Sequence, residues 1–136
     1  IEYVTEKNGV AYYNDSKGTN PDAAIRGITA MNRPTVLIGG GFDKQSEYDE
    51  WIESFHGKVK KLILIGETKK KIAETARKCG FTAYMFADTL EEAVTLASRE
   101  AKEGDAVLLS PACASWDMFG SYEERGEKFK ELVKSL

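Results

Sequence analysis

The chain alternates short, nearly unbroken apolar runs with longer stretches that are apolar on one face only. Runs of this length and composition are typical of strands buried on both faces of a parallel sheet. The stretches between them are long enough for the helices that connect parallel strands. This alternation restricts the chain to an α/β fold. The runs are TVLI at 35–38, LILI at 62–65, AYMF at 83–86 and AVLL at 106–109.

Helical periodicity fills the intervening segments. Asn20 and Pro21 suit the N-cap and the first turn of one helix, and residues 89–92 and 121–124 have the capping-box spacing. Gly80 is a C-terminal signal for another helix. The apolar positions of the predicted helices are Ala24, Ile25, Ile28 and Met31; Tyr48, Trp51, Ile52 and Phe55; Ile72, Ala76 and Cys79; Leu90, Ala93, Val94 and Ala97; and Phe129, Leu132, Val133 and Leu136.

The segment IEYVTEKNGVAYY at 1–13 predicts a β-hairpin, because an Asn-Gly pair favours a tight turn between two alternating strands. The expected fold is an open, mostly parallel, Rossmann-like sheet of about six strands, with this antiparallel hairpin at the N-terminus and helices on both faces. We expect residues 1–136 to form a single domain. Since the chain opens on Ile1 inside a predicted strand, we also expect it to be a fragment of a longer chain.

The composition excludes several classes of protein. Charged residues make up 30% of the chain and hydrophobic ones 42%, which argues against long disordered tracts. The net charge of −3 gives no basic surface for nucleic acid, and no apolar run approaches the roughly 18 residues of a membrane span. Cys79 and Cys113 lie far apart without a C-x-x-C motif or a histidine cluster, so neither a disulfide framework nor a zinc site is indicated. A reducing cytoplasm is the expected compartment.

Polar segments follow three of the predicted strands. They are NDSKGTN at 14–20, GGGFDK at 39–44 and SPACASWDMF at 110–119. The carboxyl ends of the strands in an open parallel sheet are where ligands bind. NDSKGTN combines an acid, a base, two hydroxyls and a glycine, which is more polar chemistry than a simple turn requires. We therefore expect the three segments to form one ligand site.

Each segment also has a purely structural interpretation. The glycines at 39–41 match neither G-x-G-x-x-G nor a P-loop, and on pattern alone they indicate a turn. Lys17 and Lys44 could be solvated surface charges. Cys113 is expected to be a buried structural thiol, since the single histidine, His56, belongs to an exposed helix end.

Four further residues of these segments have structural alternatives of the same kind. Trp116 and Phe119 could be core residues, because large aromatic side chains are usually buried. Asp15 and Asn20 could be capping groups and nothing more. The pattern of residue types alone does not separate these alternatives from a ligand site.

The three segments, with LLSPACASWDMF followed by YEERGEKF at 122–129, resemble the C-terminal domain of the bacterial Mur ligases, and in particular the member that adds D-glutamate. The resemblance extends over essentially the whole chain. Its motifs D-S-K-x-T-N and S-P-A-C-A-S are specific, because the sister ligases carry other sequences at these two places.

The resemblance implies a three-domain, ATP-dependent, ADP-forming amide ligase of peptidoglycan synthesis. In the family, ATP phosphorylates the L-alanine carboxylate of UDP-N-acetylmuramoyl-L-alanine, and the amine of D-glutamate attacks the acyl phosphate. The N-terminal domain holds the UDP-sugar, and the central domain holds the ATP P-loop and the Mg²⁺ sites. This chain has no G-x-x-x-x-G-K-[ST] motif. The resemblance therefore makes it the third domain, which carries D-glutamate, closes over the nucleotide and is inactive alone.

Position by position, the resemblance assigns Thr19 and Lys44 to one carboxylate of D-glutamate. It assigns Ser115, with the backbone near Tyr122, to the other carboxylate. A dicarboxylate needs a cation and several hydroxyl or N–H donors, because charge-assisted hydrogen bonds are the strong ones. The family commonly has Phe at the position of Tyr122 and an aliphatic residue at that of Trp116, so the pocket wall is expected to differ here.

The resemblance also assigns two residues to the nucleotide, Asp15 to the ribose hydroxyls and Lys17 to phosphate oxygens. It implies neither a catalytic residue nor a metal ligand in this domain. Two other classes stay open: the terminal domain of a sister Mur ligase or of folylpolyglutamate synthase, and a stand-alone nucleotide-binding α/β domain. Neither is expected to carry the D-S-K-x-T-N loop except by chance.

Overall fold

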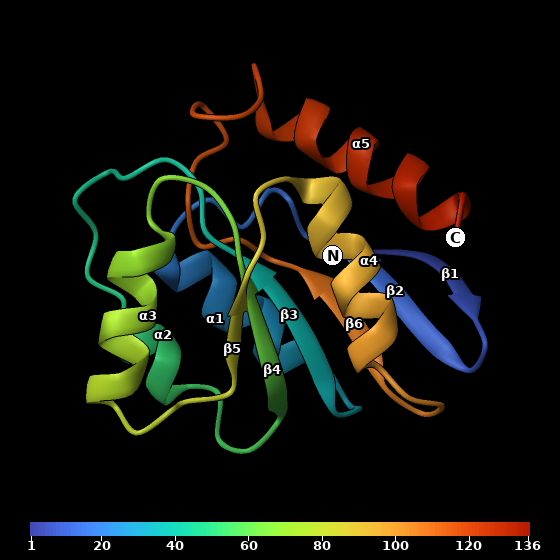
Figure 1. Ribbon diagram of the computed structural model, residues 1–136, viewed down its shortest axis with the longest axis horizontal. Helices are drawn as coiled ribbons and strands as arrows, with labels where there is room; N and C mark the ends of the chain where they lie inside the picture. Colours follow the sequence, from blue (N-terminus) through green and yellow to red (C-terminus); the bar gives the residue numbers. More distant parts are fainter.

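A computed structural model describes residues 1–136 as one central sheet covered by helices on both faces (Figure 1). The six strands lie in the order β1-β2-β6-β3-β4-β5, with β1 and β2 antiparallel and the other pairs parallel. The elements are β1 Glu2–Lys7, β2 Val10–Asn14, α1 Pro21–Ala30, β3 Thr35–Gly39, α2 Asp49–Glu53, β4 Val59–Leu64, α3 Lys69–Lys78, β5 Tyr84–Phe86, α4 Leu90–Glu100, β6 Ala106–Leu109 and α5 Tyr122–Lys134. The predicted fold is confirmed.

Alternate residues of the central strands face two separate cores. Leu37 of β3 and Leu108 of β6 belong to the core under α1, α2 and α3. Ile38 and Leu109 belong to the core under α4 and α5. All four side chains are fully buried. The sheet is therefore sandwiched between two helical layers, as near-continuous apolar strands require.

The local signals of the sequence form as expected. Asn8 and Gly9 both have positive φ, 54° and 77°, which is the conformation of a type I′ hairpin turn. The Asn20 side chain accepts a hydrogen bond from Ala23 N at the start of α1. Thr89 and Ser121 cap α4 and α5 in the same way. None of the helices combines the length and the apolar character needed to cross a membrane.

Two expectations about these elements are wrong. AYMF was expected to be buried on both faces, but β5 is an edge strand that pairs only with β4, and Phe86 is 46% exposed. The helix predicted around Trp51 is only the short α2, with Tyr48 at its N-cap and Phe55 in the following turn. For Trp116, the structure rules out the alternative of a core residue, because its side chain is 63% exposed.

Candidate functional site

The loops that follow β2 and β6 are joined by hydrogen bonds at the carboxyl edge of the sheet. We name the segments 14–20, 39–44 and 110–119 the first, second and third loops. Asp15 N donates to Leu109 O at 2.7 Å, and Ala112 N donates to Gly18 O at 2.9 Å. The Ser110 hydroxyl donates to Asp15 Oδ2 at 2.8 Å. Because β6 pairs with β2, the first and third loops form one continuous surface.

The second loop is joined to the third in the same manner. Gly40 N donates to Pro111 O and Phe42 N donates to Ala114 O, each at 2.9 Å. The rings of Phe42 and Trp116 pack with their centroids 5.3 Å apart. These contacts place Lys44, at the end of the second loop, at the same edge of the sheet as the buried Ser115 of the third loop. They confirm that all three loops lie together.

The glycines of the second loop are required by close packing rather than by flexibility. Gly40 has φ of 100°, and a Cβ on it would lie 2.1 Å from Ile65 O. A Cβ on Gly41 would lie 2.5 Å from Ala114 O. Gly41 N also donates to Thr68 Oγ1 at 3.0 Å. The second loop is therefore a fixed segment packed against the third loop and against the residues that follow β4.

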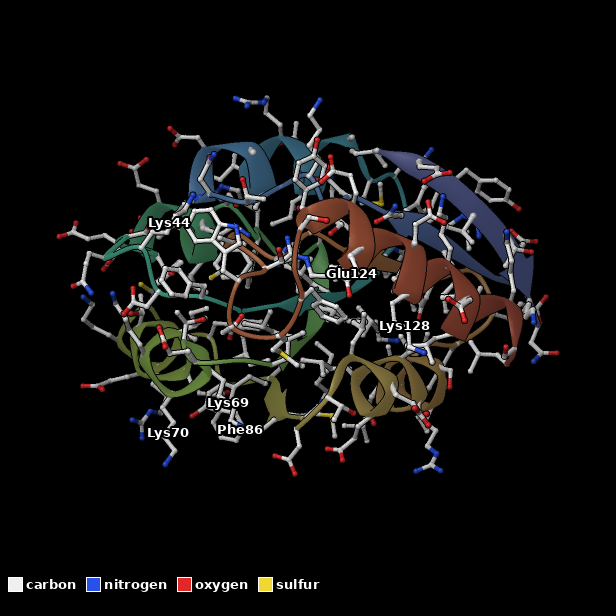
Figure 2. All side chains as sticks on the ribbon, turned by 90° about the horizontal axis from the view of Figure 1, so that it is seen from above. Lys44, Lys69, Lys70, Phe86, Glu124 and Lys128 are labelled. Atoms are coloured by element: carbon white, nitrogen blue, oxygen red, sulfur yellow. The ribbon has the colours of Figure 1, made fainter.

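The four residues predicted for D-glutamate lie at this edge in different environments. Ser115 is 2% exposed, and its Oγ is a buried polar atom without a hydrogen-bond partner. Lys44 is exposed and forms no salt bridge. Figure 2 looks onto this edge and shows Lys44 at its rim, with Glu124 of α5 nearer the centre. Thr19 and Tyr122 are half-buried.

The two residues predicted for the nucleotide line an open cavity of about 400 Å³. Asp15, Lys17 and Arg26 line it. Gly18 and Gly27 also line it, and a Cβ on either would come within 3 Å of both Asp15 Oδ2 and Ser110 Oγ, so the two glycines make room for the Asp15–Ser110 pair. Burial raises the pKa of Asp15, although the hydrogen bond from the Ser110 hydroxyl acts in the opposite direction. Two cations and one carboxylate suit a ligand with both phosphate oxygens and hydroxyls.

Sequence reasoning missed Arg125, which is 1% exposed beneath the loops. Its Nε donates to Ser16 Oγ at 2.8 Å, Nη2 donates to Ser16 O at 2.7 Å, and Nη1 donates to Cys113 O at 3.0 Å. Burial lowers the pKa of Arg125 to about 10. A signal was present, because Arg125 stands four residues before Phe129 on the apolar stripe of α5, where a charge is unusual.

Cys113 is buried, which confirms its expected structural character. Its Sγ shares hydrogen bonds with Tyr48 OH at 3.3 Å and with Thr68 Oγ1 at 3.4 Å. Burial raises the pKa of the Cys113 thiol, so it is a poor nucleophile. His56 is exposed in the turn after α2, also as expected.

The chain has no group of three or more His, Cys, Asp or Glu side chains placed to hold a metal ion. The cavity beside the first loop that Lys17 and Arg26 line has one carboxylate, that of Asp15. These residues do not fit a complete Mg²⁺ site, which prefers oxygen ligands from carboxylates, phosphates and water.

Comparison with known proteins decides the family. Residues 1–113 match the family described as Mur ligase, glutamate ligase domain, which covers most of the chain. The chain belongs to this Mur ligase family. The resemblance inferred from the loop motifs is thereby confirmed.

This Mur ligase domain is 63% identical to "UDP-N-acetylmuramoylalanine--D-glutamate ligase" of Thermoanaerobacter sp. (strain X514). It is 59% identical to the protein of the same name from Lachnospira eligens. Each match covers 100% of the chain and 30% of the relative. The chain therefore spans about 30% of the length of the curated relatives it matches.

Solved structures share the fold of this Mur ligase domain. The murein peptide ligase Mpl from Psychrobacter arcticus has a TM-score of 0.65 at 10% identity, covering 100% of this chain and 30% of that one. The MurF ligase from Thermotoga maritima in complex with ADP has a TM-score of 0.53 at 18% identity, covering 97% of this chain and 30% of that one. The assignment of individual side chains to D-glutamate or nucleotide stays a prediction.

Proposed function

We propose that residues 1–136 are the terminal domain of a longer, cytoplasmic, ATP-dependent and ADP-forming ligase that adds D-glutamate to UDP-N-acetylmuramoyl-L-alanine in peptidoglycan synthesis. The observation that carries the proposal is the 63% identity over the whole chain to a relative named for this reaction. Two free cysteines, one of them buried, are compatible with a reducing compartment.

In this proposal the domain binds D-glutamate at the carboxyl edge of the sheet. The Lys44 ammonium and the Thr19 hydroxyl hold one carboxylate, and Ser115 with the backbone near Tyr122 holds the other. The unpartnered Oγ of Ser115 supports this role, since a buried hydroxyl without a partner is costly and a ligand carboxylate would satisfy it. Fixing both carboxylates leaves the amine as the free end, which orients it for attack.

The nucleotide occupies the neighbouring cavity in this proposal. Asp15 accepts hydrogen bonds from ribose hydroxyls, and Lys17 pairs with phosphate oxygens. Arg26, on α1, adds a second positive charge on the same cavity. ATP supplies the phosphoryl group that activates the acceptor carboxylate, and we place the Mg²⁺ ligands outside this chain because no suitable cluster occurs in it. If the central domain holds the same nucleotide, contact with it would let this domain close over the reacting groups and exclude water.

The proposal is tested with the full-length ligase that carries this domain. Release of ADP is measured with UDP-N-acetylmuramoyl-L-alanine and a panel of D-glutamate, L-glutamate, L-lysine and meso-diaminopimelate. We expect turnover with D-glutamate and at least about a hundredfold lower kcat/KM with the others, because an unpaired buried polar group penalises the wrong substrate strongly. Equal or better turnover with another amino acid would refute the assignment of D-glutamate.

A further inference from the structure

Arg125 is a buried cation without a carboxylate partner. It is 1% exposed, and all three of its hydrogen bonds go to neutral oxygens. A buried charge is costly unless it is well paired, and an apolar residue of similar volume is often as stable. Since Phe129 and Val133 follow on the same buried stripe, an apolar side chain at 125 would suit the helix. The presence of arginine therefore calls for an explanation beyond packing.

The acceptors of Arg125 belong to two different ligand loops. Ser16, which accepts from both Nε and Nη2, lies between Asp15 and Lys17 in the first loop. Cys113, whose carbonyl accepts from Nη1, lies two residues before Ser115 in the third loop. One guanidinium thus connects the backbone of both loops to α5.

The Ser16 hydroxyl extends this connection to the start of α5. Its Oγ accepts from Arg125 Nε at 2.8 Å and donates to Tyr122 O at 2.7 Å. The hydroxyl is buried and both of its hydrogen bonds are formed within the chain. The first loop, the third loop and the first turn of α5 therefore share one hydrogen-bond network, in which Arg125 makes three of the four contacts.

We propose that Arg125 is a positioning residue that holds the first and third loops in register, so that the nucleotide half and the D-glutamate half of the site form together. This inference rests on the proposed function, because it takes the ligands of the two loops from it. Arg125 is 1% exposed beneath the loops, so a ligand bound on their surface would not contact it. It acts through Ser16 and the carbonyl of Cys113.

Holding both loops requires the planar guanidinium of arginine. The guanidinium presents donors in fixed directions and reaches three acceptors at once, whereas an ammonium is a point charge on a flexible stem. Lysine at 125 retains the charge but cannot reproduce the fixed fork. Methionine at 125 removes both the charge and all the donors.

The test uses the full-length ligase with Arg125→Lys and Arg125→Met, and the KM values for D-glutamate, ATP and the UDP-sugar are measured in turn. We expect both Arg125 variants to raise the KM for D-glutamate and the KM for ATP together, by at least about fivefold, since misplacement of about 1 Å costs up to a hundredfold. The KM for the UDP-sugar is expected to stay unchanged. Val133→Ala is the matched control, because it removes a buried side chain from the same helix without touching the loops.

A purely structural role predicts a different pattern. Arg125→Met would then behave like Val133→Ala, with less active enzyme and a lower kcat but unaltered KM values, and that result would overturn the inference. A rise in only one of the two KM values would also overturn it.

Ser16→Ala keeps the inference testable if the Arg125 variants do not fold. This change deletes only the hydroxyl that accepts from Arg125 and donates to Tyr122 O. We expect it to raise the KM values for D-glutamate and ATP together by about threefold, which corresponds to a single hydrogen bond. Unchanged KM values would overturn the inference. A parent ligase that does not consume D-glutamate would instead overturn the proposed function itself.

Discussion

Replacing Gly40 by alanine tests whether the second loop is a fixed part of the site or a flexible turn. Gly40 has φ of 100°, a region that L side chains rarely adopt. A Cβ at this position would meet Ile65 O at 2.1 Å, and the next atoms within reach, Ile65 C and N, lie at 3.2 Å. All of these are backbone atoms of the residue directly after β4, so no side-chain rotation relieves the clash.

The structure sets the size of the effect. The disfavoured backbone conformation costs about 1–2 kcal/mol, and displacement of packed backbone adds about 1–3 kcal/mol. We therefore expect Gly40→Ala to lower the free energy of unfolding by about 2–5 kcal/mol, with a central value of about 3 kcal/mol. For a chain of this length, that loss corresponds to a fall in Tm of about 10 °C.

Gly80→Ala is the matched control. Gly80 also has positive φ, 85°, but a Cβ on it would find nothing within 4 Å. It therefore carries the conformational cost alone, and the expected fall in Tm is about 4–6 °C. Differential scanning calorimetry on the 136-residue chain measures both variants. A Tm for Gly40→Ala no lower than that of Gly80→Ala would refute the close-packed second loop.

Three further predictions concern the chain and its nucleotide half. The 136-residue chain should unfold cooperatively on its own but should not catalyse ATP-dependent ligation. Measurable ligation by this chain would contradict the expectation that phosphoryl transfer depends on the other domains. In the full-length ligase, Asp15→Ala or Lys17→Ala should weaken the compaction that ATP analogues cause more than it weakens D-glutamate binding. Solution scattering measures this compaction. Equal compaction in variant and parent would show that neither residue belongs to the nucleotide site. Because burial raises the pKa of Asp15 in the folded state, its ionisation lowers stability as the pH rises through that pKa. Asp15→Asn should therefore raise Tm at pH 7, with a gain that fades below the ordinary carboxyl pKa of 3.8, and a gain independent of pH would show that the charge is not the cause.

The sequence was sufficient for most of the fold because its signals are local. Capping residues such as Asn20 and Thr89, the Asn8–Gly9 turn and the apolar runs each specify structure within a few residues. The order of the strands is not local. The insertion of β6 between β2 and β3 is what makes the three loops neighbours, and no periodicity reports which strands pair. The position of β5 at the edge was missed for the same reason.

The sequence predicted that the three loops lie together, but not the contacts that hold them in place. Three polar loops after parallel strands indicated the edge, and the loop motifs indicated the family. The sequence shows Arg125 as an unusual charge on an apolar stripe but does not show its role, because its acceptors on Ser16 and Cys113 belong to loops outside α5. Gly40 was interpreted as a turn because the carbonyl of Ile65, which requires glycine there, lies in the segment that follows β4, distant in sequence.

The effect of Lys44→Ala on the KM for D-glutamate tests the central claim most directly. Lys44 forms no salt bridge within the chain, so its ammonium is free to pair with a ligand. If it pairs with a D-glutamate carboxylate in a closed site, removing it leaves that carboxylate desolvated and unpaired, at a cost of about 2–5 kcal/mol.

At about 1.4 kcal/mol per tenfold, we expect the apparent affinity of the full-length ligase for D-glutamate to fall at least tenfold. Lys44→Arg should rescue it only in part, because a wide planar fork replaces a point charge. The KM for the UDP-sugar, which the family resemblance assigns to the N-terminal domain, should barely change. A solvated lysine predicts no effect, so an unaltered KM for D-glutamate and an unaltered kcat in Lys44→Ala would contradict the account.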